Sequence, residues 1–175
     1  MKKLILALMM LLLVAGTSCK KQEEKHILLP GEEVISAYPN GKIRETAFFE
    51  GSEPNRGKLK SFEFYITGQK KKEFNYRDNH YYGPWIYWYK NGKIMAEGIF
   101  DEKTLIPGEG TGRGIYYWPD GKKMIELDVR STGKERTAHV TYYDGAGNVY
   151  TNENIPEKVK GKIRLTIQNW ENGKI

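Results

Sequence analysis

The chain has 175 residues, of which 39% are apolar, 13% aromatic and 29% charged, and its formal net charge is +6. So many aromatic residues exclude a disordered chain, and nineteen glycines with twelve tyrosines argue against a helical bundle. One cysteine excludes a disulfide framework, and three scattered histidines argue against a His/Cys zinc site.

The first eighteen residues have the layout of a secretory signal peptide. A positive start ends at Lys3, and an apolar run covers 4–14, too short for the roughly 20 residues that span a bilayer. The segment 16–19, Gly-Thr-Ser-Cys, resembles the lipobox of bacterial lipoproteins, with Gly16 where an aliphatic residue is usual. The resemblance implies cleavage before Cys19 and lipid attachment to its sulfur. The alternatives are an ordinary exported protein with a free thiol and a plain membrane anchor.

Cleavage before Cys19 removes Lys2 and Lys3, which lowers the net charge to +4. So mild a charge on an envelope protein argues against a nucleic-acid partner. Residues 20–25 mix both charges without an apolar side chain, which is typical of a solvated tether. We therefore expect a signal peptide over 1–18, a tether over 19–33 and one folded domain over 34–175. The expected location is the bacterial cell envelope, with a lipid anchor and the outer membrane favoured.

A unit of aromatic residues, a turn and a lysine recurs along the rest of the chain. Its clearest copy covers 83–97, with the sequence Gly-Pro-Trp-Ile-Tyr-Trp-Tyr-Lys-Asn-Gly-Lys-Ile-Met-Ala-Glu. The anchor glycines follow one another at spacings of 27, 24, 29, 26 and 26 residues. So even a spacing predicts repeated supersecondary units. The anchors are Gly41, Gly68, Gly92, Gly121, Gly147 and Gly173.

Each unit is predicted to form a β-hairpin, because Asn-Gly and Asp-Gly favour two-residue type I′ turns. With the Asn-Gly pair at 91–92 as the turn, Tyr89 is expected opposite Ile94 and Trp88 opposite Met95. No segment after residue 30 shows a long helical period with caps. Because a lone hairpin is marginal in water, the hairpins are expected to share one sheet.

The predicted fold is therefore all-β: a repeat-built antiparallel β-meander of about six hairpins that form one elongated sheet. The last unit, 172–175, stops just after its turn. We expect it to leave an unpaired edge to which another chain could add a strand.

The repeats resemble the MORN-repeat variant, whose pattern is Gly-x-Trp-x-x-Tyr-x-x-x-Gly followed by Lys and Glu. The match covers about 34–151 and, more loosely, the C-terminal end. The resemblance implies an elongated β-meander that binds other molecules without catalysis. Some bacterial relatives carry the label of a toxin–antitoxin system antitoxin, which fits poorly with an exported lipoprotein. The matching residues are Gly83, Trp85, Gly92, Lys93 and Glu97, while Trp88 takes the place of the pattern's Tyr.

Aromatic residues of the repeats are the candidate binding surface. Both alternating faces of the run 85–89 are apolar, so one face packs on neighbouring hairpins. The other face is either covered as well or exposed as an aromatic strip for a ligand. The same run also looks like choline- and glucan-binding cell-wall repeats, which makes a wall glycan the alternative to a protein partner. The candidate contact residues are Trp85, Tyr87, Trp88, Tyr89 and Trp118, with Lys90, Lys93, Arg113 and Lys122 around them as a solvated rim or a surface for acidic partners or lipid headgroups.

Motifs for catalysis are weak. The glycine-rich segment 108–114 lacks the Gly-Lys-Ser/Thr end of a P-loop, and the Ser-x-x-Lys at 131–134 lacks its companion motifs. The loop that begins at Asp144 lacks the oxygen ligands of a calcium site. We therefore predict a non-catalytic binding or scaffold protein without a cofactor or metal, whose partner is a protein or another envelope component. The histidines, His26, His80 and His139, lie in three different regions.

Overall fold

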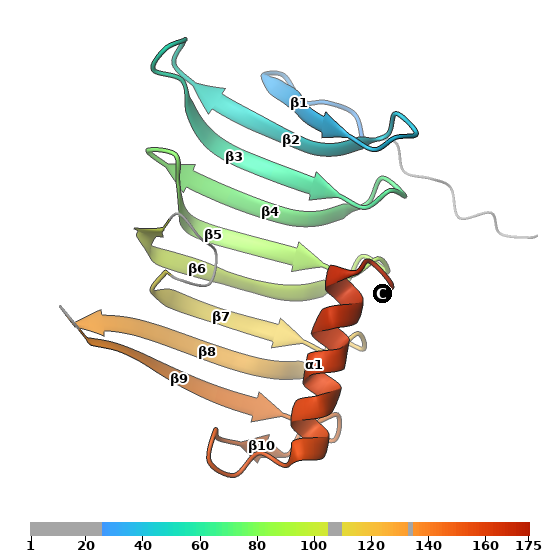
Figure 1. Cartoon of the computed structure of the whole chain (residues 1–175), viewed down its shortest axis with the longest axis vertical. Helices are drawn as coiled ribbons and strands as arrows, with labels where there is room; N and C mark the ends of the chain where they lie inside the picture. The colour runs from blue at the N-terminus through green and yellow to red at the C-terminus, as the bar shows by residue number, and fades with distance from the viewer. Residues whose placement is uncertain (1–25, 105–109, 133–134) are drawn as a thin grey trace, which may run out of the picture.

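Ten antiparallel strands form a single sheet in which each strand pairs with its neighbours in the sequence, and one helix follows (Figure 1). The computed structural model describes residues 26–104, 110–132 and 135–175. The predicted all-β meander of hairpins is therefore confirmed, whereas the expected signal peptide and Cys19 lie outside the described residues. Within the described ranges, no helix has the length and apolar character needed to cross a bilayer. The elements are β1 (Glu32–Ala37), β2 (Ile43–Glu50), β3 (Gly57–Phe64), β4 (Lys70–Arg77), β5 (His80–Trp88), β6 (Ile94–Thr104), β7 (Gly112–Tyr117), β8 (Lys123–Thr132), β9 (Glu135–Tyr143), β10 (Val149–Tyr150) and α1 (Glu157–Glu171).

Five loops at one end of the strands share one hydrogen-bond pattern. In the loop between β5 and β6, the Gly92 amide donates to the Tyr89 carbonyl at 3.0 Å, and the Tyr89 amide donates to the Lys93 carbonyl at 2.9 Å. The glycines of all five loops have φ between 80° and 95°. This is a three-residue loop in which a type I turn is followed by a glycine in the left-handed conformation. These glycines are Gly41, Gly68, Gly92, Gly121 and Gly147.

The expected two-residue type I′ turns are therefore wrong. A type I′ turn needs positive φ at both central residues, but Asn91 keeps an ordinary φ. Its side-chain Oδ1 instead accepts a hydrogen bond from the Lys93 amide at 3.0 Å. This bond stabilises the turn while the backbone of Asn91 stays in the right-handed conformation. Both central residues have positive φ only in the β4–β5 loop of the described chain, at Asp78 (51°) and Asn79 (60°).

The register of β5 against β6 differs from the predicted register, because the loop has three residues and not two. Trp88 lies opposite Ile94, and Tyr87 lies opposite Ala96, whereas the sequence predicted Trp88 opposite Met95. The residue skipped between these two pairs is Met95, which forms a bulge on β6 and is fully buried.

The C-terminal segment forms a helix rather than a sixth hairpin. Four of the five apolar residues of α1 recur at helical spacing and pack against the sheet, whereas Leu165 is exposed. The Gly173 amide donates to the Trp170 carbonyl at 2.9 Å, and the Lys174 amide donates to the Asn169 carbonyl at 2.8 Å, which is a Schellman motif. The sixth anchor glycine therefore ends a helix, and the expected unpaired half-hairpin at 172–175 is wrong. The four packed residues are Val159, Ile163, Ile167 and Trp170.

The core lies between α1 and one face of the sheet. Figure 1 shows the helix running across the ends of β5 to β10, near the glycine loops, while β1 to β4 extend beyond the helix. One cluster surrounds Trp170 and contains Trp85 and Tyr89, and a second surrounds Ile163 and contains Trp118. The helix thus covers the loop end of this face and does not cover the rest of it.

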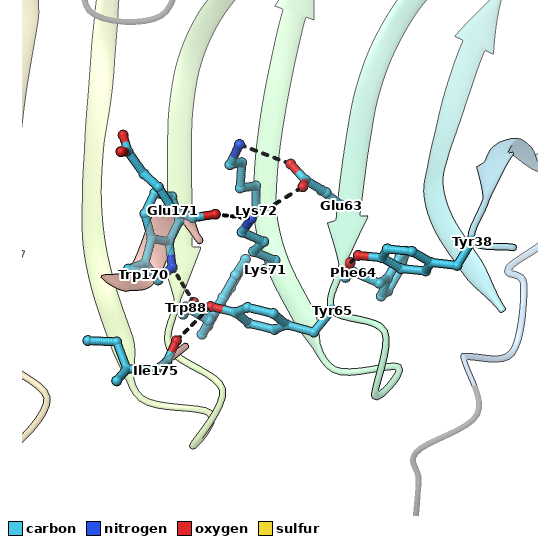
Figure 2. A network of polar contacts seen from close by, with 10 residues as sticks. All are labelled: Tyr38, Glu63, Phe64, Tyr65, Lys71, Lys72, Trp88, Trp170, Glu171 and Ile175. Atoms are coloured by element: carbon cyan, nitrogen blue, oxygen red, sulfur yellow. Dashed lines mark hydrogen bonds and ion pairs between the residues drawn. The ribbon is translucent and has the colours of Figure 1, made fainter. Parts of the chain in front are cut away.

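An aromatic residue at the start of each of the first four glycine loops ties its hairpin to the next one. In each case, the side chain donates a hydrogen bond to a backbone carbonyl near the next loop. The sequence separations are 26, 23, 28 and 25 residues, so this ladder is one structural reason for the repeat length. The bonds run from Tyr38 to Phe64 (2.7 Å), Tyr65 to Trp88 (2.7 Å), Tyr89 to Tyr117 (2.6 Å) and Trp118 to Tyr143 (3.2 Å), and the first two appear in Figure 2.

Replacing Tyr89 with phenylalanine tests this ladder. Tyr89 is 1% exposed, so the change leaves the Tyr117 carbonyl without this buried donor. The expected loss is about 1–2 kcal/mol of unfolding free energy, measured by urea denaturation. The matched control is Tyr82→Phe, because the Tyr82 hydroxyl has no hydrogen-bond partner in the described ranges; its effect should stay within about 0.5 kcal/mol. Equal effects of the two changes would contradict the ladder.

Candidate binding cleft beneath the C-terminal helix

Trp170 fastens the end of α1 to the hairpin of β5 and β6 (Figure 2). Its indole Nε1 donates to the Trp88 carbonyl at 2.8 Å, and its ring stacks on Tyr87 with 5.0 Å between centroids and 21° between planes. The Tyr65 hydroxyl donates to the same carbonyl at 2.7 Å. One backbone oxygen therefore accepts bonds from the preceding hairpin and from the helix, which fixes the position of the helix on the sheet.

A cleft of about 510 Å³ opens between α1 and the sheet, and we call it the helix cleft. Aromatic and aliphatic side chains from five strands line it together with two buried or half-buried helix residues, and three charged residues stand at its rim. A mainly apolar recess with a few polar groups is the usual form of a ligand-binding site. The lining residues are Tyr87, Met95, Tyr116, Ile125, Leu127, Val140, Tyr142, Ile167 and Trp170, with Lys71, Lys72 and Glu171 at the rim.

Two tyrosines of the helix cleft have hydroxyls without a protein partner. Burial raises the pKa of Tyr116, and burial together with the neighbouring Tyr116 raises the pKa of Tyr87, so both keep their protons at neutral pH. Neither hydroxyl forms a hydrogen bond with any residue of 26–104, 110–132 or 135–175, whereas Tyr142 donates to Asn152 at 2.7 Å. These two lining tyrosines therefore have unpaired hydroxyl donors, which suit a ligand with carbonyl oxygens or other neutral acceptors.

Charges at the rim largely compensate one another. The Lys72 Nζ lies 3.0 Å and the Lys71 Nζ 3.6 Å from the Glu63 carboxylate, as Figure 2 shows. Glu171 also lines the cleft, and its backbone carbonyl accepts a hydrogen bond from Lys71 at 3.4 Å. The ion pairs of both rim lysines with Glu63, together with Glu171 at the rim, favour a neutral ligand or segment over a phosphate or another strong anion.

The five candidate contact residues do not form one exposed strip. Strand alternation places Trp85 and Tyr87 on the face that α1 covers and Trp88 on the opposite face, where its ring lies 5.7 Å from the Lys70 ammonium. Trp85 is 7% exposed, and the other two, Tyr89 and Trp118, are 1% and 3% exposed. Of the five, the structure brings only Tyr87 to the helix cleft.

Apart from Tyr87, the aromatic and aliphatic residues that line the cleft were not identified as site residues from the sequence, and Leu127, Val140 and Trp170 are examples. Leu127 and Val140 pair across β8 and β9, and each alternates with polar neighbours, which is a signal for one apolar sheet face. Trp170 follows Ile163 and Ile167 at helical spacing, a signal that the Asn-Gly pair after it obscured.

A second hollow of about 480 Å³ lies on the opposite face, over β6 to β9, but carboxylates that line it already have partners. Glu97 accepts a hydrogen bond from the Tyr117 hydroxyl at 2.8 Å. Hydrogen bonds from Lys123 and Tyr143 hold the pKa of Glu126 below its usual value. These contacts stabilise neighbouring strands, so we place the candidate site in the helix cleft.

The chain was also compared with known proteins. No protein-family model matches it, and no curated protein matches it. The function is therefore inferred from the residues and contacts described above.

Proposed function

We propose that this protein is a non-catalytic binding module of the bacterial cell envelope, held there by a lipid on Cys19, and that its helix cleft binds a segment of a partner protein. The helix cleft carries this proposal, because an apolar recess with two unused tyrosine donors is built to receive a ligand. The lipobox-like segment 16–19 supports the anchor. The resemblance of the repeats to the MORN-repeat variant supports binding without catalysis.

A peptide segment suits the cleft better than a sugar. Apolar side chains of the segment would cover Leu127 and Val140, and its backbone carbonyls would accept hydrogen bonds from Tyr87 and Tyr116. A wall glycan was expected to stack on an exposed aromatic strip, but most of those rings are buried. A protein partner is therefore favoured over the glycan.

Site-specific photo-cross-linking in living cells tests the proposal. A benzoylphenylalanine at Val140, which lines the cleft, should give a covalent adduct of one defined size after irradiation. The matched control position is Leu165, which is 57% exposed on α1 and does not line the cleft. Leu127→Asp, which places a charge in the recess, should abolish the adduct at Val140. Adducts of the same sizes at both positions, or none at Val140, would argue against a partner in the cleft.

The glycan alternative has its own test. Residues 20–175, which omit the signal peptide and Cys19, should stay in the supernatant when they are centrifuged with isolated cell-wall sacculi. Pelleting that competing sugars prevent would replace the protein partner by a wall glycan. Trp85→Ala and Trp88→Ala would then locate the contact on one face of the sheet or the other.

A further inference from the structure

Exposed large apolar side chains concentrate at the N-terminal end of the described chain. Five of the nine lie within residues 27–35, and we call these five the N-terminal apolar patch. The remaining four, at positions 59, 66, 149 and 165, are spread over β3, the β3–β4 loop, β10 and α1. Scattered apolar residues are normal on a surface, whereas a cluster marks an interaction site. The patch consists of Ile27 (81% exposed), Leu28 (42%), Leu29 (55%), Val34 (46%) and Ile35 (44%).

A buried carboxylate fixes the patch on the sheet. Glu32 accepts hydrogen bonds from the Leu29 amide at 2.9 Å and from the Thr46 hydroxyl, and it pairs with His26 at 2.8 Å. Burial opposes its ionisation, but these three bonds outweigh burial and hold the pKa of Glu32 below its usual value. The His26 ring also packs on Phe64, with 4.4 Å between centroids. The patch is therefore displayed by an ordered segment, and its exposure is a feature of the fold.

An added β-strand does not account for the patch. β1 is an edge strand, but its register shifts on both sides of Ser36, and the side chain of Glu32 is buried. Bulges and inward-pointing charges are the devices that protect an edge from further pairing. Residues 27–29 also precede β1, so a strand that paired with β1 would leave them exposed. A second copy that pairs edge to edge is therefore disfavoured.

The length of chain between the patch and Cys19 indicates another occupant. Ile27 follows Cys19 by eight residues, which span at most about 28 Å when fully extended. A lipid on Cys19 would hold the patch within that distance of the bilayer. Apolar side chains near a lipid anchor are stabilised when they enter the interface of the bilayer, and a second contact strengthens anchoring.

We propose that the N-terminal apolar patch rests on the surface of the lipid bilayer in which Cys19 is anchored. This inference rests on the lipid anchor of the proposed function. It orients the molecule with β1 toward the membrane. The helix cleft, which lies beside β5 to β9 farther along the sheet, then stays accessible to a partner (Figure 1).

Photo-cross-linking to lipid tests this orientation. The full-length protein is purified from bacteria, its modification at Cys19 is measured by mass spectrometry, and it is reconstituted into phosphatidylethanolamine and phosphatidylglycerol vesicles. A benzoylphenylalanine at Ile35 should gain the mass of a phospholipid after irradiation. The same group at Val149, which is 60% exposed on the opposite edge strand, should gain none. Ile27→Glu should remove most of the adduct at Ile35, and the control Leu165→Glu should leave it unchanged.

The outcomes separate the two proposals. An unmodified Cys19 would overturn the lipid anchor and this inference with it. A modified Cys19 without a lipid adduct at Ile35 would overturn this inference alone. An adduct between two copies of the chain at Ile35 would also overturn it, in favour of a dimer.

Discussion

Trp170→Ala should lower the free energy of unfolding by about 3–5 kcal/mol, the range for truncating a buried aromatic residue. Trp170 is 5% exposed, and its ring stacks on Tyr87 while its Nε1 donates to the Trp88 carbonyl. Alanine removes both contacts and leaves a cavity between α1 and the sheet. Urea denaturation followed by circular dichroism measures the loss. Because Trp170 also lines the helix cleft, the same change should abolish the adduct at Val140.

Two variants show whether this loss comes from docking of the helix. Leu165→Ala on the same helix removes an exposed side chain and should change stability by no more than about 0.5 kcal/mol. Trp170→Phe keeps a ring on Tyr87 but loses the bond to Trp88, so its loss should lie between those of the two alanine variants. If Trp170→Ala cost no more than Leu165→Ala, the helix would not be held on the sheet in solution.

The hairpin order was predictable because one physical contact sets the repeat length. A loop-opening aromatic side chain such as Tyr65 bonds to a carbonyl of the next hairpin, so the chain must return to the same place after each repeat. The even spacing of the loop glycines reflects this repeat length in the sequence. Ten strands in chain order follow from the same regularity.

Turn type and the last unit were not predictable from the Asn-Gly pair alone. The pair at 91–92 belongs to a three-residue hairpin loop, whereas the pair at 172–173 ends a helix. In both places, glycine supplies the left-handed conformation, and the residues before it decide which structure results. Pro39 stands at the position that a type I turn favours, and Ile163, Ile167 and Trp170 recur at helical spacing. These longer patterns carried the missing information.

The candidate site depended on that helix. Tyr87 was identified from the sequence as a possible contact, but its neighbours in the helix cleft include Ile167 and Trp170, which were expected in strands or turns. Tyr89 and Trp118 were expected in an exposed aromatic strip, but they lie in the two core clusters that contain residues of α1. Because the sequence predicted a hairpin in place of α1, it predicted a site on the surface of the sheet and missed the cleft beneath the helix.

Gly98→Ala should lower the free energy of unfolding by about 3 kcal/mol, the upper end of the range for overpacking a core. A Cβ on Gly98 would lie 2.2 Å from the Arg113 carbonyl oxygen and 2.5 Å from the Trp85 ring. The carbonyl belongs to the neighbouring strand β7, so it cannot withdraw without breaking the pairing of β6 with β7. Gly114 also lies under the Trp85 ring, where an added Cβ would approach it to 2.9 Å. The indole of Trp85 is therefore seated on two glycines of adjacent strands.

Gly161→Ala is the matched control, since it makes the same chemical change where nothing lies within 4 Å of the added Cβ. Gly161 stands inside α1, and replacing a helical glycine with alanine stabilises a helix by about 1 kcal/mol. Urea denaturation should therefore give effects of opposite sign for the two variants. A stable Gly98→Ala protein would mean that Trp85 does not rest on the strands, and the packing that supports Tyr87 in the helix cleft would have to be different. A destabilised Gly161→Ala protein would mean that residue 161 is not helical, because added helix propensity is the sole effect expected there.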